Sequence, residues 1–201
     1  LGLNPLDGFS STTGIISSTQ ISGLPVDFVV ANPSTVESSL LGFVATENDG
    51  LSIIDYQDVE QPIKASQLPI DDSLTTIEFL THNSQVAIGG KKGLHMVDVS
   101  KPNDPLLIAS HSFSYPIVAM AKLSELLVVA TRSSLMVVNP QTGSILAEDS
   151  TLSSISSIAT QANQIYVIKN QNQLVSLEFV DSELNLLDSV GFPTVSYTHL
   201  R

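Results

Sequence analysis

The feature that most constrains the fold is a segment that recurs about every 40 residues. Each copy consists of two short apolar runs joined by a polar turn, and a leucine that serves here as an anchor opens the second run. Successive anchors are 43, 41 and 39 residues apart. A period of this length is typical of architectures built by repeating one supersecondary unit. The anchors are Leu51, Leu94, Leu135 and Leu174.

The apolar runs have the length and composition of β-strands. They are five or six residues long, rich in Val and Ile, and bounded by turn residues, and helix signals are nearly absent. In the turn at 47–50, Asp49-Gly50 supplies the positive φ angles of a tight hairpin. About four strands in roughly 40 residues correspond to one β-propeller blade. A β-solenoid needs a shorter period, and an immunoglobulin-like sandwich needs about seven strands. The sequence therefore predicts an all-β fold: a β-propeller fragment with about four blades of four antiparallel strands, plus the tail of another.

The repeat also divides the chain. Residues 1–23 are expected to be the tail of a preceding blade, because "NPLDG" at 4–8 resembles "NPQTG" at 139–143. The blades are expected to occupy 24–194. The segment "VSYTHLR" at 195–201 resembles the translation of a sequencing-adapter read-through found in metagenomic assemblies, so we expect it to be non-native and without function. Both ends are therefore expected to be truncated.

The best-preserved copy carries a family resemblance. The stretch "GLHMVDVSKPNDPLLIAS" at 93–110 resembles the LVIVD repeat, a bacterial propeller motif. The copy at 50–66 is weaker, and Asn139 and Glu178 replace the motif's aspartate in the last two copies. The resemblance implies a propeller within large, mostly secreted or surface-attached bacterial proteins, and it implies no single activity. The matching positions are Gly93, Leu94, Val97, Asp98, Val99, Ser100, Pro102, Pro105 and Ser110.

The positions that match this motif have structural explanations. An aspartate such as Asp98 can accept hydrogen bonds from the backbone N–H groups of the turn that follows, here those of Ser100 and Lys101. Proline lacks an N–H donor and suits a connection or an edge strand. Glycine provides backbone conformations that a side chain would resist. The predicted turn and edge residues are Gly50, Asp55, Gly93, Asp98, Ser100, Pro102 and Pro105.

The histidines show no metal-binding spacing, because none lies three or four residues from another. His95 lies inside a predicted strand and is expected to be a hydrogen-bonded structural residue. His82 is expected in a solvated turn, and His111 near a blade junction. A composite site formed by His82 and His111 from different blades stays open as an alternative. His199 lies in the segment expected to be non-native. No catalytic, cofactor-binding or metal-binding residue is predicted.

Charge limits the possible partners. Eight basic and twenty acidic residues give a formal net charge of −12, which disfavours nucleic acid and anionic membrane surfaces and leaves room for weak calcium binding. The turn at 47–50 lacks the spacing of a calcium-binding loop, and the pair at 71–72 is expected to be solvated or to cap a loop. No apolar run has the length of a membrane span, so no membrane insertion is predicted.

Three functional hypotheses follow. The leading one is a non-catalytic scaffold that binds a protein or carbohydrate ligand, within a larger extracellular or surface-attached bacterial protein. The second is a propeller-type hydrolase or lactonase with a metal at the central channel. The third is a purely structural spacer. The sequence specifies neither the ligand nor the oligomeric state.

Overall fold

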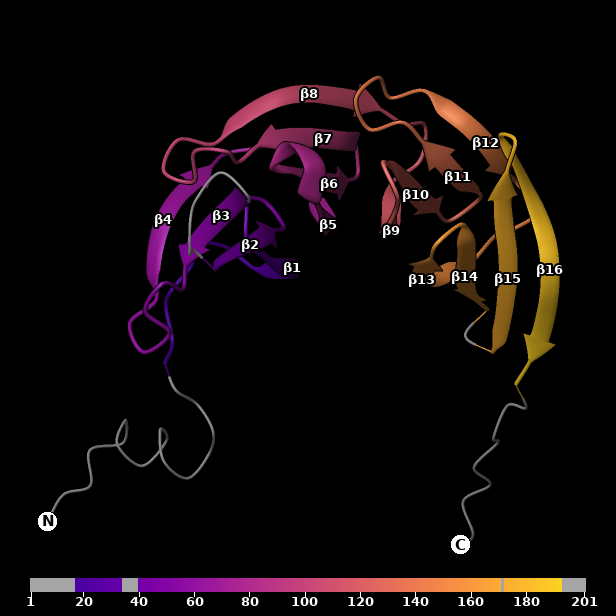
Figure 1. Ribbon diagram of the computed structural model, residues 1–201, viewed down its shortest axis with the longest axis horizontal. Coiled ribbons are helices and arrows are strands. Elements are labelled where there is room, and N and C mark those ends of the chain that lie inside the picture. Colours follow the sequence, from indigo (N-terminus) through magenta and orange to yellow (C-terminus); the bar gives the residue numbers. More distant parts are fainter. Residues whose placement is uncertain (1–16, 34–39, 171, 193–201) are drawn as a thin grey trace, which may run out of the picture. The chain divides into compact units, whose positions relative to one another are not determined.

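The chain folds into four sheets, each made from four consecutive strands (Figure 1). The structure is a computed structural model that describes residues 17–33, 40–170 and 172–192. The first sheet contains β1 (Pro25–Ala31), β2 (Leu41–Thr46), β3 (Gly50–Asp55) and β4 (Ile63–Leu68). The second contains β5 (Leu74–Leu80), β6 (Gln85–Gly90), β7 (Gly93–Asp98) and β8 (Leu106–Ser112). The third contains β9 (Ile117–Leu123), β10 (Leu126–Thr131), β11 (Leu135–Val138) and β12 (Ile145–Asp149). The fourth contains β13 (Ile155–Gln161), β14 (Gln164–Lys169), β15 (Gln173–Val180) and β16 (Glu183–Gly191).

This arrangement confirms the predicted all-β class and the four strands per repeat. The four anchor leucines lie in the third strand of their sheets, as the period requires. Residues 1–16 of the predicted blade tail (1–23) and the whole segment expected to be non-native (195–201) lie outside the described residues, so these assignments stay predictions. The helical content of the described residues is a single 3-10 turn, Thr81–Asn83. None of the described helices has the length and hydropathy to cross a membrane.

Neighbouring strands in a sheet pair in sequence order, as hairpins joined end to end. The antiparallel pairing of third and fourth strands shifts register once in each of three sheets, between Ile53 and Ile54, Val137 and Val138, and Ser176 and Leu177. Such bulges increase the local twist of an edge strand. The repeat thus reproduces a local irregularity as well as the strand order.

The chain forms two compact units, and the first comprises residues 1–88 and 95–110. Its core lies between the first two sheets and joins Phe43 of β2 to Phe79 of β5, whose stacked rings have centroids 5.5 Å apart. A polar contact also links the sheets. The Asp27 carboxylate in β1 accepts hydrogen bonds of 2.9 Å from the Thr76 hydroxyl and the Ile77 N–H in β5. Successive sheets in this unit therefore share one core.

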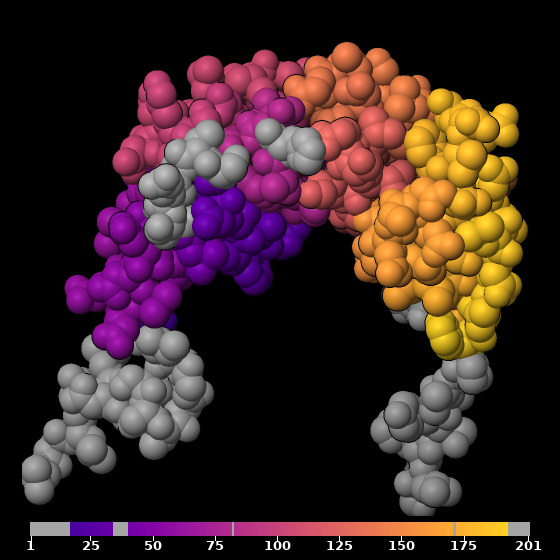
Figure 2. Space-filling model, in the orientation of Figure 1, coloured from indigo at the N-terminus to yellow at the C-terminus, as the bar shows by residue number. Residues whose placement is uncertain are grey.

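The second unit comprises residues 89–94 and 111–201, and its described part repeats this construction. Its core lies between the third and fourth sheets and includes Val128, Val137, Ile165 and Val175, all essentially buried. In the space-filling view, the residues of β13 and β14 adjoin those of β15 and β16 (yellow), as expected within one sheet (Figure 2).

Two turn glycines are required by the backbone. Gly50 has a φ of +84°, and a Cβ there would overlap the carbonyl oxygen of Leu68. Gly93 has a φ of +154°, and a Cβ there would overlap the carbonyl oxygen of His111. Because both obstacles are main-chain atoms, a side chain at either position would displace the neighbouring segment.

Candidate functional site

The motif aspartates hold the turn that follows the third strand. Asp98 Oδ1 accepts a 2.8 Å hydrogen bond from the backbone N–H of Ser100, and Asp55 Oδ1 accepts one of 2.7 Å from Gln57. In the third sheet Asn139 Oδ1 takes the same place and accepts a 2.9 Å bond from the N–H of Gln141. This bond needs only a side-chain oxygen, so asparagine can replace the motif's aspartate without changing the turn.

Replacing Asp98 by alanine is expected to lower the free energy of unfolding by about 1 kcal/mol, because the Ser100 N–H loses its acceptor. Asp98→Asn keeps the oxygen and should change stability by less than half as much. Chemical denaturation followed by circular dichroism measures both. Equal losses for the two variants would contradict this role.

The motif prolines lie in the connection between β7 and β8. The carbonyl oxygen of Pro102 accepts a 2.5 Å hydrogen bond from the Ser66 hydroxyl in β4. Pro105 immediately precedes β8, the fourth strand and an edge of its sheet. Because proline has no N–H group, it costs no hydrogen bond between strands at these positions. It also hinders the pairing of another strand with the edge of the sheet.

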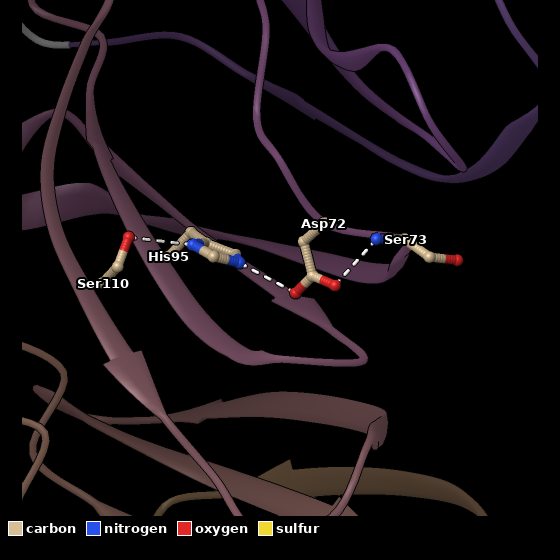
Figure 3. A network of polar contacts seen from close by, with 4 residues as sticks. All are labelled: Asp72, Ser73, His95 and Ser110. Atoms are coloured by element: carbon tan, nitrogen blue, oxygen red, sulfur yellow. Dashed lines mark hydrogen bonds and ion pairs between the residues drawn. The ribbon is translucent and has the colours of Figure 1, made fainter.

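A partly buried polar network joins three segments of the first unit, running from the buried Asp72 and His95 to the exposed Ser110 (Figure 3). His95 in β7 contacts Asp72 Oδ2 through Nε2 and the Ser110 hydroxyl in β8 through Nδ1, each at 2.9 Å. Asp72 also accepts a 2.7 Å bond from the N–H of Ser73. The side chains of His95 and Asp72 are 9% and 1% exposed. His95 is thus a hydrogen-bonded interior residue.

Asp72 lies in a different environment from the one expected. The sequence indicated a solvated or loop-capping residue, and the structure buries Asp72 just before β5. Its bond to Ser73 is of the capping kind, whereas its second oxygen pairs with a histidine 23 residues away. Local sequence carries no signal for such a contact. Only an apolar neighbourhood, with Ile70 and Leu74 on either side, hinted at burial.

The hydroxyl of Ser110, the imidazole of His95 and the carboxylate of Asp72 are the same groups as in the catalytic triads of serine hydrolases. In those triads the imidazole uses Nε2 toward the hydroxyl and Nδ1 toward the carboxylate. In this network the two nitrogens have exchanged partners, and the carboxylate is reached through Nε2. The network ties β7 to its neighbour β8 and to the segment before β5. We therefore assign it a structural role.

The other histidines do not add a site within the described residues. The side chain of His82 is not described. His111 Nε2 donates a 3.2 Å hydrogen bond to the Pro140 carbonyl, and its ring fills the space that a Cβ on Gly143 would need. The composite site of His82 and His111 stays a prediction. Over the described ranges, no three His, Asp or Glu side chains lie close enough to hold a metal ion.

An open hollow of about 520 Å³ lies in the second unit, at the ends of neighbouring hairpins. It is lined by Arg132 from the β10–β11 turn, Ser154 from the segment before β13, and Asn170 from the β14–β15 turn. Two backbone bonds of 3.1 Å connect these segments: the Ser154 N–H donates to Arg132, and the Asn170 N–H donates to Ser154. The remaining lining residues are Ile155 and Ser156.

Hydrogen bonds to a buried threonine side chain stabilise the turn that carries Arg132. The buried Thr131 Oγ1 accepts hydrogen bonds from the N–H groups of Ser133 (3.2 Å) and Ser134 (3.1 Å). In the first sheet Thr46, also buried, donates to the Gly50 carbonyl at 2.9 Å across the equivalent turn. The shared letters "VAT" at 44–46 and 129–131 were the available sequence signal for this role.

Solved structures share this architecture. The chain aligns with the β-propeller domain of Cps50 (Swd1) from Myceliophteria thermophila at a TM-score of 0.61 and 14% identity, covering 83% of this chain and 57% of that one. The fold is that of a β-propeller. Apo AztD from Citrobacter koseri gives a TM-score of 0.59 at 16% identity, covering 85% and 47%. A functionally unknown protein from Desulfotomaculum acetoxidans gives 0.69 at 13%, covering 86% and 58%.

These likenesses concern the propeller fold alone, because identities are low. The chain spans about half the length of the structures it matches. No family model matches the sequence, so the LVIVD resemblance stays an expectation. No curated protein matches it either.

Proposed function

We propose that these propeller blades form a non-catalytic scaffold that binds a ligand at the ends of its hairpins. The observation that carries this proposal is the hollow lined by Arg132, Ser154 and Asn170, whose three segments are joined by backbone hydrogen bonds. A ligand meeting such a hollow does not have to order the backbone around it, which lowers the entropic cost of binding.

The polar side chains that stabilise the blades are different from those that line the hollow, which supports the proposed binding role. Asp98 and Asp55 hold turns, and His95 with Asp72 holds strands together. These side chains form hydrogen bonds within the blades. The side chains of the hairpin ends vary between repeats, as expected where a constant framework presents a changing surface.

The cellular setting is part of the proposal. The resemblance of 93–110 to the LVIVD repeat favours a larger bacterial protein that is secreted or attached to the cell surface. A hollow lined by arginine, serine and asparagine residues offers hydrogen-bond donors and acceptors that a hydroxyl-rich ligand such as a polysaccharide can use.

Affinity electrophoresis through gels containing neutral or acidic polysaccharides tests this function. In parallel, ester, lactone and glycoside substrates are incubated with the protein, with and without Ca²⁺ or Zn²⁺. We expect retention by at least one polysaccharide and no product in any incubation. Turnover that depends on added metal would instead support the hydrolase hypothesis, and mobility unchanged in every gel would support the spacer.

A further inference from the structure

We propose that the Arg132 hollow binds the carboxylate of an acidic sugar, a uronate unit of a polysaccharide. This inference rests on the proposed binding function and names its ligand class. The sequence holds two arginines, Arg132 and Arg201, and Arg201 lies outside the described residues. Guanidinium binds carboxylates through two parallel N–H···O bonds, a geometry that ammonium cannot offer.

The Arg132 side chain is not used by the fold. It is exposed, and it forms no ion pair or side-chain hydrogen bond with the described residues. Among the described residues that line the hollow, none is acidic. In a chain with twenty acidic and eight basic residues, an arginine without a carboxylate partner has its charge available to a ligand.

The repeat supplies an internal comparison. Glu47 occupies the place of Arg132 in the first sheet, since each follows the "VAT" that ends the second strand. The Glu47 carbonyl accepts a 2.9 Å bond from the Leu74 N–H at the start of the next sheet, as Arg132 accepts one from Ser154. This backbone contact with the next sheet therefore forms with either charge at the position. Blade construction does not require arginine at this position, and its exposed guanidinium is accessible to a ligand.

The groups beside Arg132 favour a sugar as the carrier of the carboxylate. Ser154 and Asn170, whose side chains carry a hydroxyl and an amide, line the hollow. The Ser156 hydroxyl donates to the Ile168 carbonyl at 3.2 Å and keeps its acceptor lone pairs. This mixture of neutral donors and acceptors matches the hydroxyl groups of a sugar ring. The volume of about 520 Å³ falls within the usual range for small-ligand sites.

Calorimetric titration of the 201-residue chain tests the proposal, with trigalacturonate as the probe. Its fully methyl-esterified form and triglutamate are the comparison ligands. We expect trigalacturonate to bind, and the ester to bind at least about tenfold more weakly because it lacks the charge that Arg132 pairs. The variant Arg132→Glu should lose binding by a similar factor. Lys91→Gln removes an exposed positive charge from the β6–β7 turn and should change affinity by less than about twofold.

Each contrary result identifies a different failure. Equal binding of the ester, or unchanged affinity in Arg132→Glu, would overturn the assignment of the carboxylate to Arg132. Equal binding of triglutamate would overturn the choice of a sugar. If Arg132→Glu is still retained by the polysaccharide, the role of Arg132 is contradicted, whereas the proposed binding function is not. Absence of retention by any polysaccharide would remove both.

Discussion

Replacement of His95 by alanine is expected to lower the free energy of unfolding by about 3 to 5 kcal/mol, since it leaves the buried Asp72 carboxylate without its imidazole partner. Asp72→Ala should cost less, about 1 to 3 kcal/mol, because it removes one hydrogen-bond partner of His95 and leaves no buried carboxylate behind. Urea unfolding followed by circular dichroism measures both changes.

A variant with both substitutions distinguishes the loss of the Asp72–His95 interaction from the loss of side-chain packing. If the two side chains act as a pair, Asp72→Ala combined with His95→Ala should be no less stable than His95→Ala alone. Asp104→Ala is the matched control, because Asp104 is exposed in the connection between β7 and β8; it should change stability by less than about 0.5 kcal/mol. Additive losses in the double variant would show that the network does not couple these residues.

Replacement of Phe43 by alanine is expected to cost about 3 to 5 kcal/mol, the range for a buried phenylalanine in a core. Phe43 is fully buried in β2 and stacks on Phe79 of β5, so the change removes a contact between two sheets. The midpoint of urea unfolding should fall accordingly. Hydrogen exchange should accelerate in both sheets of the first unit, because both contribute to that core.

Phe28 in β1 provides the control for this prediction. It is the same residue type in the same sheet, yet it is 69% exposed. Phe28→Ala should change stability by less than about 0.5 kcal/mol. Faster exchange confined to the first sheet in Phe43→Ala would contradict a core shared between sheets.

Sequence predicted the strands well because each strand is specified locally. The run containing Leu51, its turn at 47–50 and its fixed distance from Leu94 are all visible within one period. A repeated architecture then follows, since each unit must bury its apolar faces against a neighbour. The turn role of Asp98 is equally local, because the carboxylate bonds to a backbone group two residues away.

The features that sequence did not predict depend on contacts between distant segments. Asp72, in the connection before β5, meets His95 of β7 across 23 residues of sequence, and no periodicity encodes that approach. The hollow requires three segments around Arg132, Ser154 and Asn170 to converge. The difference between Glu47 and Arg132 at one repeat position was visible in the sequence. It gained a meaning only when both residues were seen to accept the same backbone hydrogen bond from the start of the next sheet.

Residues that build the blades are distinct from residues that face a ligand, and the unfolding free energy of Arg132→Glu tests that distinction most directly. Because the equivalent turn already carries Glu47, we predict a change of less than about 0.5 kcal/mol in urea unfolding. A loss of about 2 kcal/mol or more would show that Arg132 belongs to the frame, and it would contradict the account.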